Sequence, residues 1–145
     1  MIRVKVKKLQ EDAFIPKCAY KGDAGYDLYS IESYVLQPGE RHLIHTGIAI
    51  ELPPFTEAQV RPRSGYALKN GITVLNSPGT IDQGYRNEIG VILINLGQEP
   101  FRIEKGDRIA QLVIKRTFKI AFIETKRLDE TQRGKKGFGS STKKR

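Results

Sequence analysis

The densest group of polar residues that could do chemistry lies in residues 75–91, LNSPGTIDQGYRNEIGV. Asn76 carries an amide that could pair with the edge of a nucleobase, and Asp82 has a short carboxylate that could orient a water molecule. Tyr85 offers a flat ring to a sugar. Each of these residues alone also fits an ordinary surface turn, so the pattern indicates chemistry only in combination.

Polar groups also stand at two places where a bare scaffold would not need them. Arg63 and Ser64 precede Gly65 in RPRSGYALKNG, directly before a short helical segment. Free N–H groups at a helix start, next to an arginine and a hydroxyl, can cradle a phosphate; the alternative is a turn in which Ser64 caps the helix. Gln111 is the one polar side chain within RIAQLVI, so it either braces the fold or reaches a ligand, because buried amides need partners.

Metal and thiol chemistry have little support in the sequence. The single cysteine, Cys18, excludes an internal disulfide and a cysteine-rich zinc site. A catalytic thiol needs a basic partner, and the local sequence supplies no histidine for that role, so we expect an inert cysteine. His42 and His45 are three residues apart, so on a strand they point to opposite faces and do not readily share a metal. We expect structural or surface histidines.

The net charge of +9 is concentrated at the C-terminus. The last 13 residues, RGKKGFGSSTKKR, contain six Lys or Arg and no acid, which leaves +3 for the rest of the chain. Such a segment has almost nothing apolar to bury, so it cannot fold alone. Its charge suits a phosphate-bearing ligand or nucleic acid, and charge alone does not separate the two.

The elements that must position these groups are short strands. A chain of 145 residues suits one domain, and alternating apolar residues in IRVKVKK, TGIAIEL, EAQVRP, ITVL, PFRIEKG and KIAFIE predict half-buried strands. EIGVILINL and RIAQLVI are nearly all apolar, which predicts strands buried on both faces. The one helical segment expected is residues 65–71. The prediction is an all-β sandwich, barrel or jelly roll.

No segment of the sequence predicts membrane insertion or export. No apolar run approaches the roughly 18 residues that a membrane-spanning helix needs. The N-terminal MIRVKVKKLQ alternates and lacks the apolar block of a signal peptide. We therefore expect a cytoplasmic protein without membrane association.

Five segments resemble, in order and spacing, the five motifs of the trimeric dUTP nucleotidohydrolases: AGYDLYS, PRSGYALKNGI, NSPGTIDQGYRNEIGVILIN, RIAQLVI and RGKKGFGSS. The resemblance runs from about residue 16 to residue 141. It implies a distorted jelly-roll β-barrel of the β-clip type, forming a homotrimer whose active sites are each built from all three chains. Residues 1–123 would be the core, and residues 124–145 a linker and a flexible C-terminal arm.

The resemblance also implies a reaction. dUTP would be hydrolysed to dUMP and pyrophosphate with Mg²⁺ on the triphosphate, which keeps uracil out of DNA and supplies dUMP for dTMP synthesis. Asp82 matches the carboxylate that positions and deprotonates the water attacking the α-phosphorus. Asn76 and the hairpin backbone with Thr80 and Ile81 match the uracil-reading groups. Tyr85 matches the ring packed under deoxyribose, where it leaves no room for a 2′-hydroxyl.

The phosphate and metal contacts follow in the same way. The residues that match triphosphate contacts are Arg63, Ser64, Gly65 and Gln111. Asp27, in AGYDLYS, matches a residue that helps to hold Mg²⁺, directly or through its waters. The expected partners are dUTP, dUMP and two further copies of the chain, without stable nucleic-acid binding.

Residues 133–141 would form a lid over the nucleotide. Arg133 would clamp the γ-phosphate, Phe138 would stack on uracil, and Gly139, Ser140 and Ser141 would wrap the phosphates. Ordering about nine residues costs around 10 kcal/mol, at roughly 1–2 kcal/mol each, whereas one base stacked on an aromatic ring returns about 1–3 kcal/mol. We therefore expect a mobile arm with dUMP and an ordered arm with a dUTP analogue. Residues 142–145 would be a solvated tail.

Two departures from the motifs are notable. Asn87 stands in the hairpin where many relatives have glycine, and asparagine is the residue besides glycine that best tolerates positive φ. We expect the hairpin to form with Asn87 in that conformation. Lys136 replaces a glycine of the arm, which adds a charge near the phosphates and slightly stiffens the segment.

Two other functions compete with dUTP hydrolysis. The dCTP deaminases have the same fold, but they need a catalytic glutamate ten residues after the aspartate, where this chain has Ile92. The second alternative is a β-fold module whose basic tail binds nucleic acid, with salt-sensitive binding that lacks sequence preference. Such a module would leave Asp82, Asn76 and Tyr85 without a task.

Overall fold

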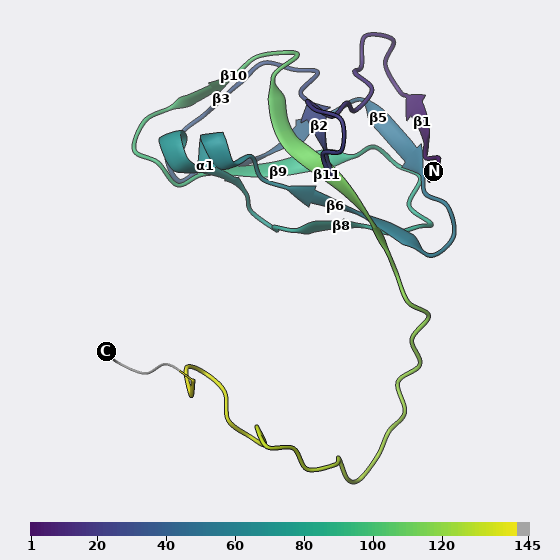
Figure 1. The fold of residues 1–145 in the computed structure, drawn as a ribbon. Coiled ribbons are helices and arrows are strands. Elements are labelled where there is room, and N and C mark those ends of the chain that lie inside the picture. Colours follow the sequence, from purple (N-terminus) through teal and green to yellow (C-terminus); the bar gives the residue numbers. More distant parts are fainter. Residues whose placement is uncertain (142–145) are drawn as a thin grey trace.

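The computed structural model describes residues 1–141, so the predicted tail at residues 142–145 lies outside the described residues. The described part forms a β-body from which a long C-terminal segment extends away (Figure 1). Its elements are β1 (Lys5–Lys8), β2 (Gly25–Tyr29), β3 (Tyr34–Leu36), β4 (Arg41–His45), β5 (Ile48–Glu51), β6 (Thr56–Arg61), α1 (Ser64–Asn70), β7 (Ile72–Val74), β8 (Gly79–Ile81), β9 (Gly90–Asn95), β10 (Phe101–Ile103) and β11 (Arg108–Arg116).

The strands pair in antiparallel sheets around one apolar core. The largest sheet has the order β2-β11-β6-β8, a three-stranded sheet has the order β4-β9-β7, and β1-β5 and β10-β3 form two-stranded sheets. Fully buried side chains from three of these sheets, such as Leu28, Leu93 and Ile103, belong to the same cluster. The all-β prediction is confirmed, and the arrangement agrees with a jelly-roll barrel.

The short helix α1 is close to its predicted position. It begins at Ser64, and Arg63 occupies the N-cap position with extended backbone (φ −94°, ψ 124°). The alternative in which Ser64 caps the helix is therefore not what the chain adopts. Gly71 ends the helix in the left-handed region at φ 69°, and a Cβ there would lie 2.6 Å from the backbone nitrogen of Gly97. Glycine meets both the conformational and the steric demand.

Strands β9 and β11 differ in how they are buried. In β11, Ile109, Ala110, Leu112 and Val113 are buried, so both faces are largely covered, as the sequence predicts. In β9, buried residues alternate with half-buried ones, so its prediction of burial on both faces is wrong for the single chain. The outer face of the β4-β9-β7 sheet carries the exposed Leu43 and half-buried isoleucines at 92 and 94.

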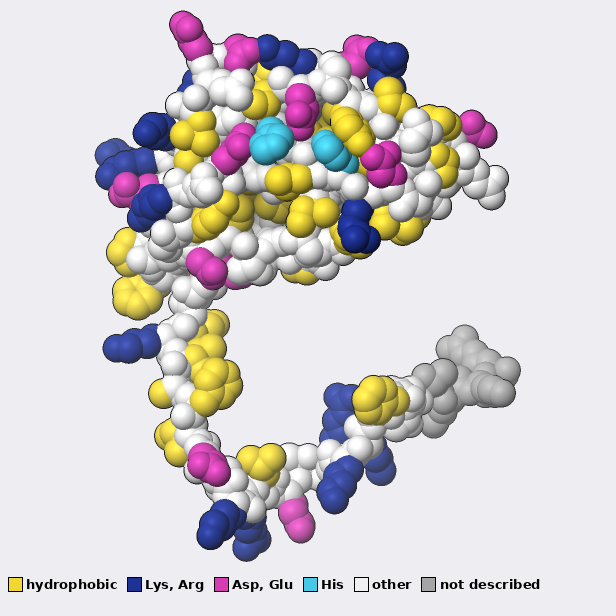
Figure 2. Space-filling view, turned by 180° about the vertical axis from the view of Figure 1, so that it is seen from behind, with side chains coloured by type: hydrophobic (Ala, Val, Ile, Leu, Met, Phe, Trp, Pro, Cys, Tyr) yellow, Lys and Arg dark blue, Asp and Glu magenta, His cyan; other side chains and the backbone are white. Residues whose placement is uncertain are grey.

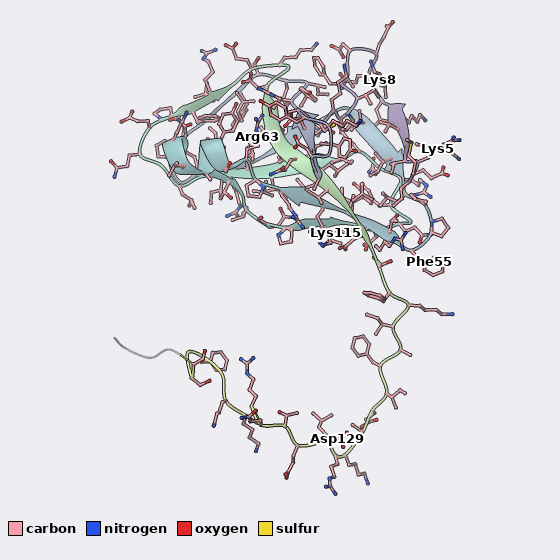
Figure 3. All side chains as sticks on the ribbon, viewed as in Figure 1. Lys5, Lys8, Phe55, Arg63, Lys115 and Asp129 are labelled. Atoms are coloured by element: carbon pink, nitrogen blue, oxygen red, sulfur yellow. The ribbon has the colours of Figure 1, made fainter. Side chains whose placement is uncertain are left out.

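The segment KIAFIE, predicted as a strand, has no regular structure. The last backbone hydrogen bond between the body and this segment, within the described residues, runs from Thr117 N–H to the Phe55 carbonyl (2.9 Å). Beyond it Phe118, Ile120 and Phe122 are 85%, 68% and 97% exposed. Figure 3 shows Asp129, which follows this segment in the chain, well away from the body. The prediction of a strand here is therefore wrong for the single chain, because no strand among residues 1–141 pairs with this segment.

None of the described residues forms a helix with the length and apolar character needed to cross a bilayer.

Candidate active site

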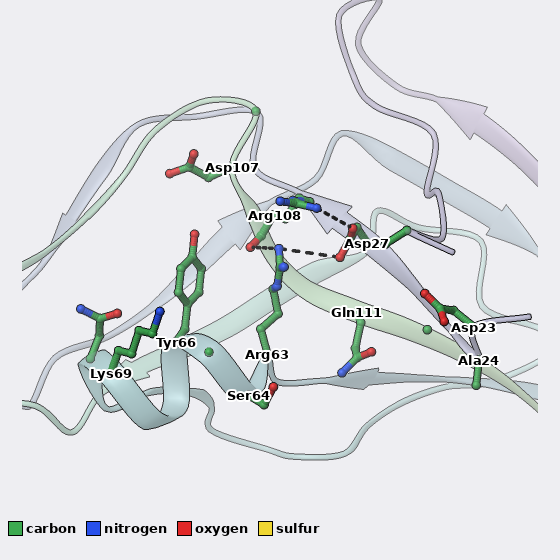
Figure 4. Close-up of a pocket in the computed structure, with 15 residues that line it drawn as sticks. Asp23, Ala24, Asp27, Arg63, Ser64, Tyr66, Lys69, Asp107, Arg108 and Gln111 are labelled. Atoms are coloured by element: carbon green, nitrogen blue, oxygen red, sulfur yellow. Dashed lines mark hydrogen bonds and ion pairs between the residues drawn. The ribbon is translucent and has the colours of Figure 1, made fainter. Parts of the chain in front are cut away.

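A polar pocket of about 730 Å³ opens where β2, α1 and β11 meet (Figure 4). Three separate segments of sequence supply its lining: the start of β2 with the loop before it, the turn into α1 with the helix itself, and the first half of β11 with the preceding turn. The predicted site residues in this lining are Asp27, Arg63, Ser64, Gly65 and Gln111. The strand pairing of β11 with both β2 and β6 brings them together.

Asp27 lies between two arginines inside this pocket. Its carboxylate is 3.7 Å from Nη1 of Arg63 and 3.5 Å from Nη1 of Arg108, and the Arg63 Nη1 also donates to the Arg108 carbonyl at 3.0 Å (Figure 4). The Asp27 side chain is only 16% exposed, whereas those of Arg63 and Arg108 are 28% and 51% exposed. The aspartate therefore fixes two guanidinium groups that keep N–H donors free for an anion.

Gln111 has two tasks that the sequence left as alternatives. Its Nε2 donates to the Pro62 carbonyl at 3.0 Å, which ties β11 to the turn before α1. The same side chain lines the pocket. It therefore braces the entrance to the helix and also stands within reach of a ligand.

A second group of predicted site residues lies on β8 and the turn that follows, outside this pocket. Ile81 is buried and Thr80 is exposed. Asp82 is exposed, and its carbonyl accepts the Tyr85 N–H at 3.0 Å, which closes a tight turn. Asn76 lies close to this strand, because a Cβ on Gly79 would meet its Nδ2 at 3.3 Å.

Asn87 does not take the conformation predicted for it. Among the non-glycine residues described, positive φ occurs only at Phe55 and Phe138, so the prediction of positive φ at Asn87 is wrong. Its Oδ1 instead accepts the Glu88 N–H at 2.8 Å, and the Tyr85 hydroxyl donates to the Glu88 carbonyl at 2.8 Å. These side-chain bonds hold the bend without a left-handed residue.

The third group, Arg133, Phe138, Gly139 and Ser140, lies on the extended C-terminal segment, away from the other two (Figures 1 and 3). Phe138 is fully exposed, and the Arg133 Nε donates only to the nearby Lys136 carbonyl at 3.2 Å. One chain thus assembles the phosphate-type pocket but does not bring the hairpin or the arm to it.

Magnesium can be tested against this pocket. Within residues 1–141 no three His, Cys, Asp or Glu side chains lie close enough to form a metal cage. Mg²⁺ does not need one, because it usually keeps several waters and binds one or two carboxylates together with substrate phosphates. Asp27 fits that role best through a metal-bound water, since both of its oxygens already face arginines.

Several lining residues were missed in the sequence: Tyr66, Lys69, Asp107 and Arg108. A signal existed for two of them, because positions 63, 66 and 69 are spaced by three and so share one face of a helix. The Arg63 guanidinium lies 5.7 Å from the Tyr66 ring centroid, a cation–π distance. The sequence offers a weaker signal for Arg108, because a charged residue at the end of an apolar strand is common and does not by itself indicate a site.

Comparisons with known proteins agree on one family. A family model described as dUTPase matches residues 11–142. A deoxyuridine 5′-triphosphate nucleotidohydrolase of Clostridioides difficile is 60% identical over 141 residues, 97% of this chain and 99% of that protein. A mutant dUTPase of Staphylococcus bacteriophage 80alpha, solved with dUpNHpp, superposes with a TM-score of 0.87 at 30% identity, covering 96% of this chain and 98% of that one. A mutant dUTPase from phage phi11 of S. aureus, described with a structural Mg(II) ion, superposes with a TM-score of 0.78 at 27% identity, covering 86% and 97%.

Proposed function

This chain belongs to the dUTPase family, and from that premise we propose how its residues divide the hydrolysis of dUTP to dUMP and pyrophosphate. The observation that carries the proposal is the pocket in which Arg63, Ser64, Gly65, Gln111 and Asp27 meet. Residues from three distant segments converge there and offer the side-chain donors of Arg63, Ser64 and Gln111 to a triphosphate.

The triphosphate is held in this pocket. Arg63, with Nη1 anchored on the Arg108 carbonyl, keeps its other donors for phosphate oxygens, and Arg108 extends the positive surface. Gln111 and the Ser64 hydroxyl add hydrogen bonds from two sides. When bound, Mg²⁺ supplies further positive charge on the phosphate oxygens, with Asp27 holding one of its waters.

Asp82 is the general base of the proposed reaction. Its side chain is exposed, and within residues 1–141 it has no hydrogen-bonded partner, so its carboxylate is free to accept a proton from water. The attacking water would be oriented by Asp82 towards the α-phosphorus. A positioned base contributes about 10²–10⁴-fold, so positive charge around the phosphates must provide much of the remaining acceleration.

The hairpin selects the nucleoside. Asn76 and the backbone of Thr80 and Ile81 would pair with uracil, and a site built to hydrogen-bond one pattern rejects another by about 10⁴–10⁵-fold. Thymine differs only by a methyl group, so it must be excluded by close packing. Tyr85 would lie under the deoxyribose and leave no room for a 2′-hydroxyl.

A homotrimer with shared active sites accounts for the separation of the three groups in one chain. The apolar outer face of the β4-β9-β7 sheet includes Leu43, which is 45% exposed, and offers a surface for assembly. The exposed Phe118, Ile120 and Phe122 alternate as in a strand and would be covered by another copy. Assembly would bring the hairpin of one chain and the arm of another to the phosphate pocket.

In the proposed division of the chain, residues 1–123 are the core, residues 124–145 are the linker and arm, and residues 133–141 close over a bound triphosphate. The partners are dUTP, dUMP and two further copies, in the cytoplasm and without stable nucleic-acid binding. The product dUMP would feed dTMP synthesis, and removal of dUTP would keep uracil out of DNA.

The decisive experiment is pyrophosphate release with Mg²⁺ from dUTP, UTP, dTTP and dCTP, run beside Asp82→Asn. We expect turnover of dUTP alone, and a loss of about 10²–10⁴-fold in the variant. Comparable turnover of UTP or dTTP, or full activity of Asp82→Asn, would contradict the proposal. Ammonia release from dCTP would instead support the deaminase alternative, for which Ile92 supplies no acid or base.

A further inference from the structure

The ring of Tyr85 is held by one hydrogen bond at its far end. Its hydroxyl donates to the Glu88 carbonyl at 2.8 Å, while its own N–H donates to the Asp82 carbonyl at 3.0 Å. The side chain is exposed, so nothing else within the described residues fixes the ring through hydrogen bonds. The position of the ring therefore depends on where the Glu88 backbone lies.

Glu88 is in turn fixed through its carboxylate. One oxygen, Oε2, lies 2.8 Å from Nδ1 of His45, and the other, Oε1, accepts the Gly47 N–H at 2.7 Å. The next residue, Ile89, donates its N–H to the Ile48 carbonyl at 2.9 Å. The end of the turn is thus fastened to the segment that connects β4 to β5.

His45 is itself rigidly placed. It is the last residue of β4, paired with Gly90 of β9, and its N–H donates to Oε1 of Glu32 at 2.9 Å. The hydrogen bond to Glu88 raises the pKa of the His45 imidazole, the charges of Glu88 and Glu32 add to this, and partial burial opposes it. The carboxylates of Glu88 and Glu32 are the charged groups that act on this ring.

The second histidine of the same strand has no such contact. His42 stacks on the ring of Tyr34, with 3.7 Å between centroids and 3° between planes. Both histidines are visible in the view of Figure 2, near acidic side chains. Their partners differ, and only His45 connects to the turn.

We propose that His45 is a positioning residue. Through the Glu88 carboxylate it fixes the distance between the Tyr85 ring and the bound sugar, and with it the discrimination between deoxyribose and ribose. The inference rests on the proposed function, in which Tyr85 packs under the sugar. A ring held at a fixed distance from the sugar can exclude a 2′-hydroxyl, whereas a ring on a more mobile turn can move away from the sugar and leave room for that hydroxyl. The His45 connection should therefore affect binding and sugar selectivity more than the chemical step.

The test compares kcat and KM for dUTP and UTP among the wild-type protein, His45→Ala, His45→Asn and the matched control His42→Ala. For His45→Ala we expect KM for dUTP to rise about fivefold, the size of one lost hydrogen bond, with kcat within about twofold. The preference for dUTP over UTP in kcat/KM should fall by about tenfold. His45→Asn can keep an N–H near the position of Nδ1, so it should restore most of the preference, and His42→Ala should not alter it.

The pH profile separates positioning from a general loss of structure. In the wild-type protein the ion pair between the His45 imidazolium and the Glu88 carboxylate is fully formed at low pH. It weakens as pH rises through the raised pKa of His45, so KM for dUTP should rise with pH in that range. His45→Asn has no titrating group, so the same rise should be absent.

The proposal is overturned if His45→Ala retains the wild-type KM and sugar preference, or if His42→Ala changes them equally. A lowered melting temperature with unchanged kinetics in His45→Ala would also overturn it, because that result describes a structural residue only. Failure of the wild-type protein to hydrolyse dUTP would be a different result, which contradicts the proposed function. In that case calorimetric binding of dUMP against UMP still decides the role of His45: the preference for dUMP must fall in His45→Ala.

Discussion

A Cβ atom on Gly25 would lie 2.1 Å from Oε1 of Gln111. The two residues are on neighbouring strands, β2 and β11, and Gln111 is in register with Asp27, two residues further along β2. The Gln111 side chain thus lies over the bare backbone at Gly25, where only glycine leaves room. This contact determines where the Gln111 amide sits in the pocket.

Gly25→Ala is therefore expected to act on catalysis through Gln111. The atom in conflict is the end of a flexible side chain, so the fold should persist while the amide moves away from the pocket and from the Pro62 carbonyl. A lost hydrogen bond to a charged phosphate corresponds to about 1.5–3 kcal/mol, so kcat/KM for dUTP should fall by at least about tenfold. Steady-state kinetics would measure this fall.

A double-mutant cycle supplies the control for this prediction. Gln111→Ala should cause a similar fall in kcat/KM, and adding Gly25→Ala to it should cost almost nothing further, because the side chain in conflict is already gone. Fully additive losses would show that Gly25 acts independently of Gln111.

Asn95 is expected to be important for stability. It is fully buried, its Nδ2 donates to the carbonyls of Leu36 (3.0 Å) and Glu99 (2.8 Å), and its Oδ1 accepts the Gly97 N–H at 2.9 Å. Asn95→Ala leaves buried backbone groups unpaired, at about 1–3 kcal/mol for each group that water cannot reach. Thermal unfolding should show a clearly lower midpoint, whereas the exposed Gln98→Ala should leave it unchanged.

Much of the fold and part of the site could be predicted from local patterns. Alternating residues identified β1, β5, β6, β7 and β10, and nearly all-apolar runs identified β9 and β11, whereas β2, β3, β4 and β8 were not predicted. A single amide within an apolar run marked Gln111 as a residue that either braces the fold or reaches a ligand. Asn95 was missed because its importance depends on carbonyls distant in sequence, which no local pattern reveals. The same holds for Arg108, whose proximity to Asp27 exists only once β11 pairs with β2.

Errors arose where the sequence alone leaves the partner or the local geometry undetermined. KIAFIE has a strand pattern, but a strand needs a neighbour, and the described chain gives it none. Asn87 was expected at positive φ from a glycine in relatives, whereas a side-chain hydrogen bond to Glu88 holds the bend. Propensity describes one residue at a time and does not choose between two ways of making the same turn.

The stability of the protein should depend on pH through His45. Its pKa is raised in the folded state by Glu88, so the folded state binds the proton more tightly than the unfolded chain does. The resulting stabilisation is fully present below the ordinary histidine pKa of about 6.5 and is lost as pH rises through the raised value. The melting temperature of the wild-type protein should exceed that of His45→Asn most at low pH, and a difference that grows with rising pH would contradict this sign.

The apolar outer face of the β4-β9-β7 sheet should control assembly. Ile92, in register with the exposed Leu43, is at the centre of this face, and a lysine there would place a charge in the proposed interface at a cost of several kcal/mol. Analytical ultracentrifugation should show a trimer for the wild-type protein and monomers for Ile92→Lys. Gln10→Lys adds the same charge to an exposed loop and should leave the trimer intact, and a trimeric Ile92→Lys would exclude this face from the interface.

The arm should close only over a triphosphate, and trypsin can report on this. Arg133, Lys135 and Lys136 are exposed cleavage sites in the described segment, and Phe138 has no contact partner there. Ordering residues 133–141 costs around 10 kcal/mol at roughly 1–2 kcal/mol per residue, and stacking of the base on Phe138 returns only about 1–3 kcal/mol. Saturating dUMP should therefore leave cleavage as fast as in the free protein, whereas dUpNHpp with Mg²⁺ should slow it strongly.

Two variants control this experiment. Phe138→Ala should weaken the protection by about 5–100-fold, the loss of one stacked base, while the linker variant Leu128→Ala should not. Equal protection by dUMP and dUpNHpp would mean that base stacking, rather than phosphate contacts, closes the arm.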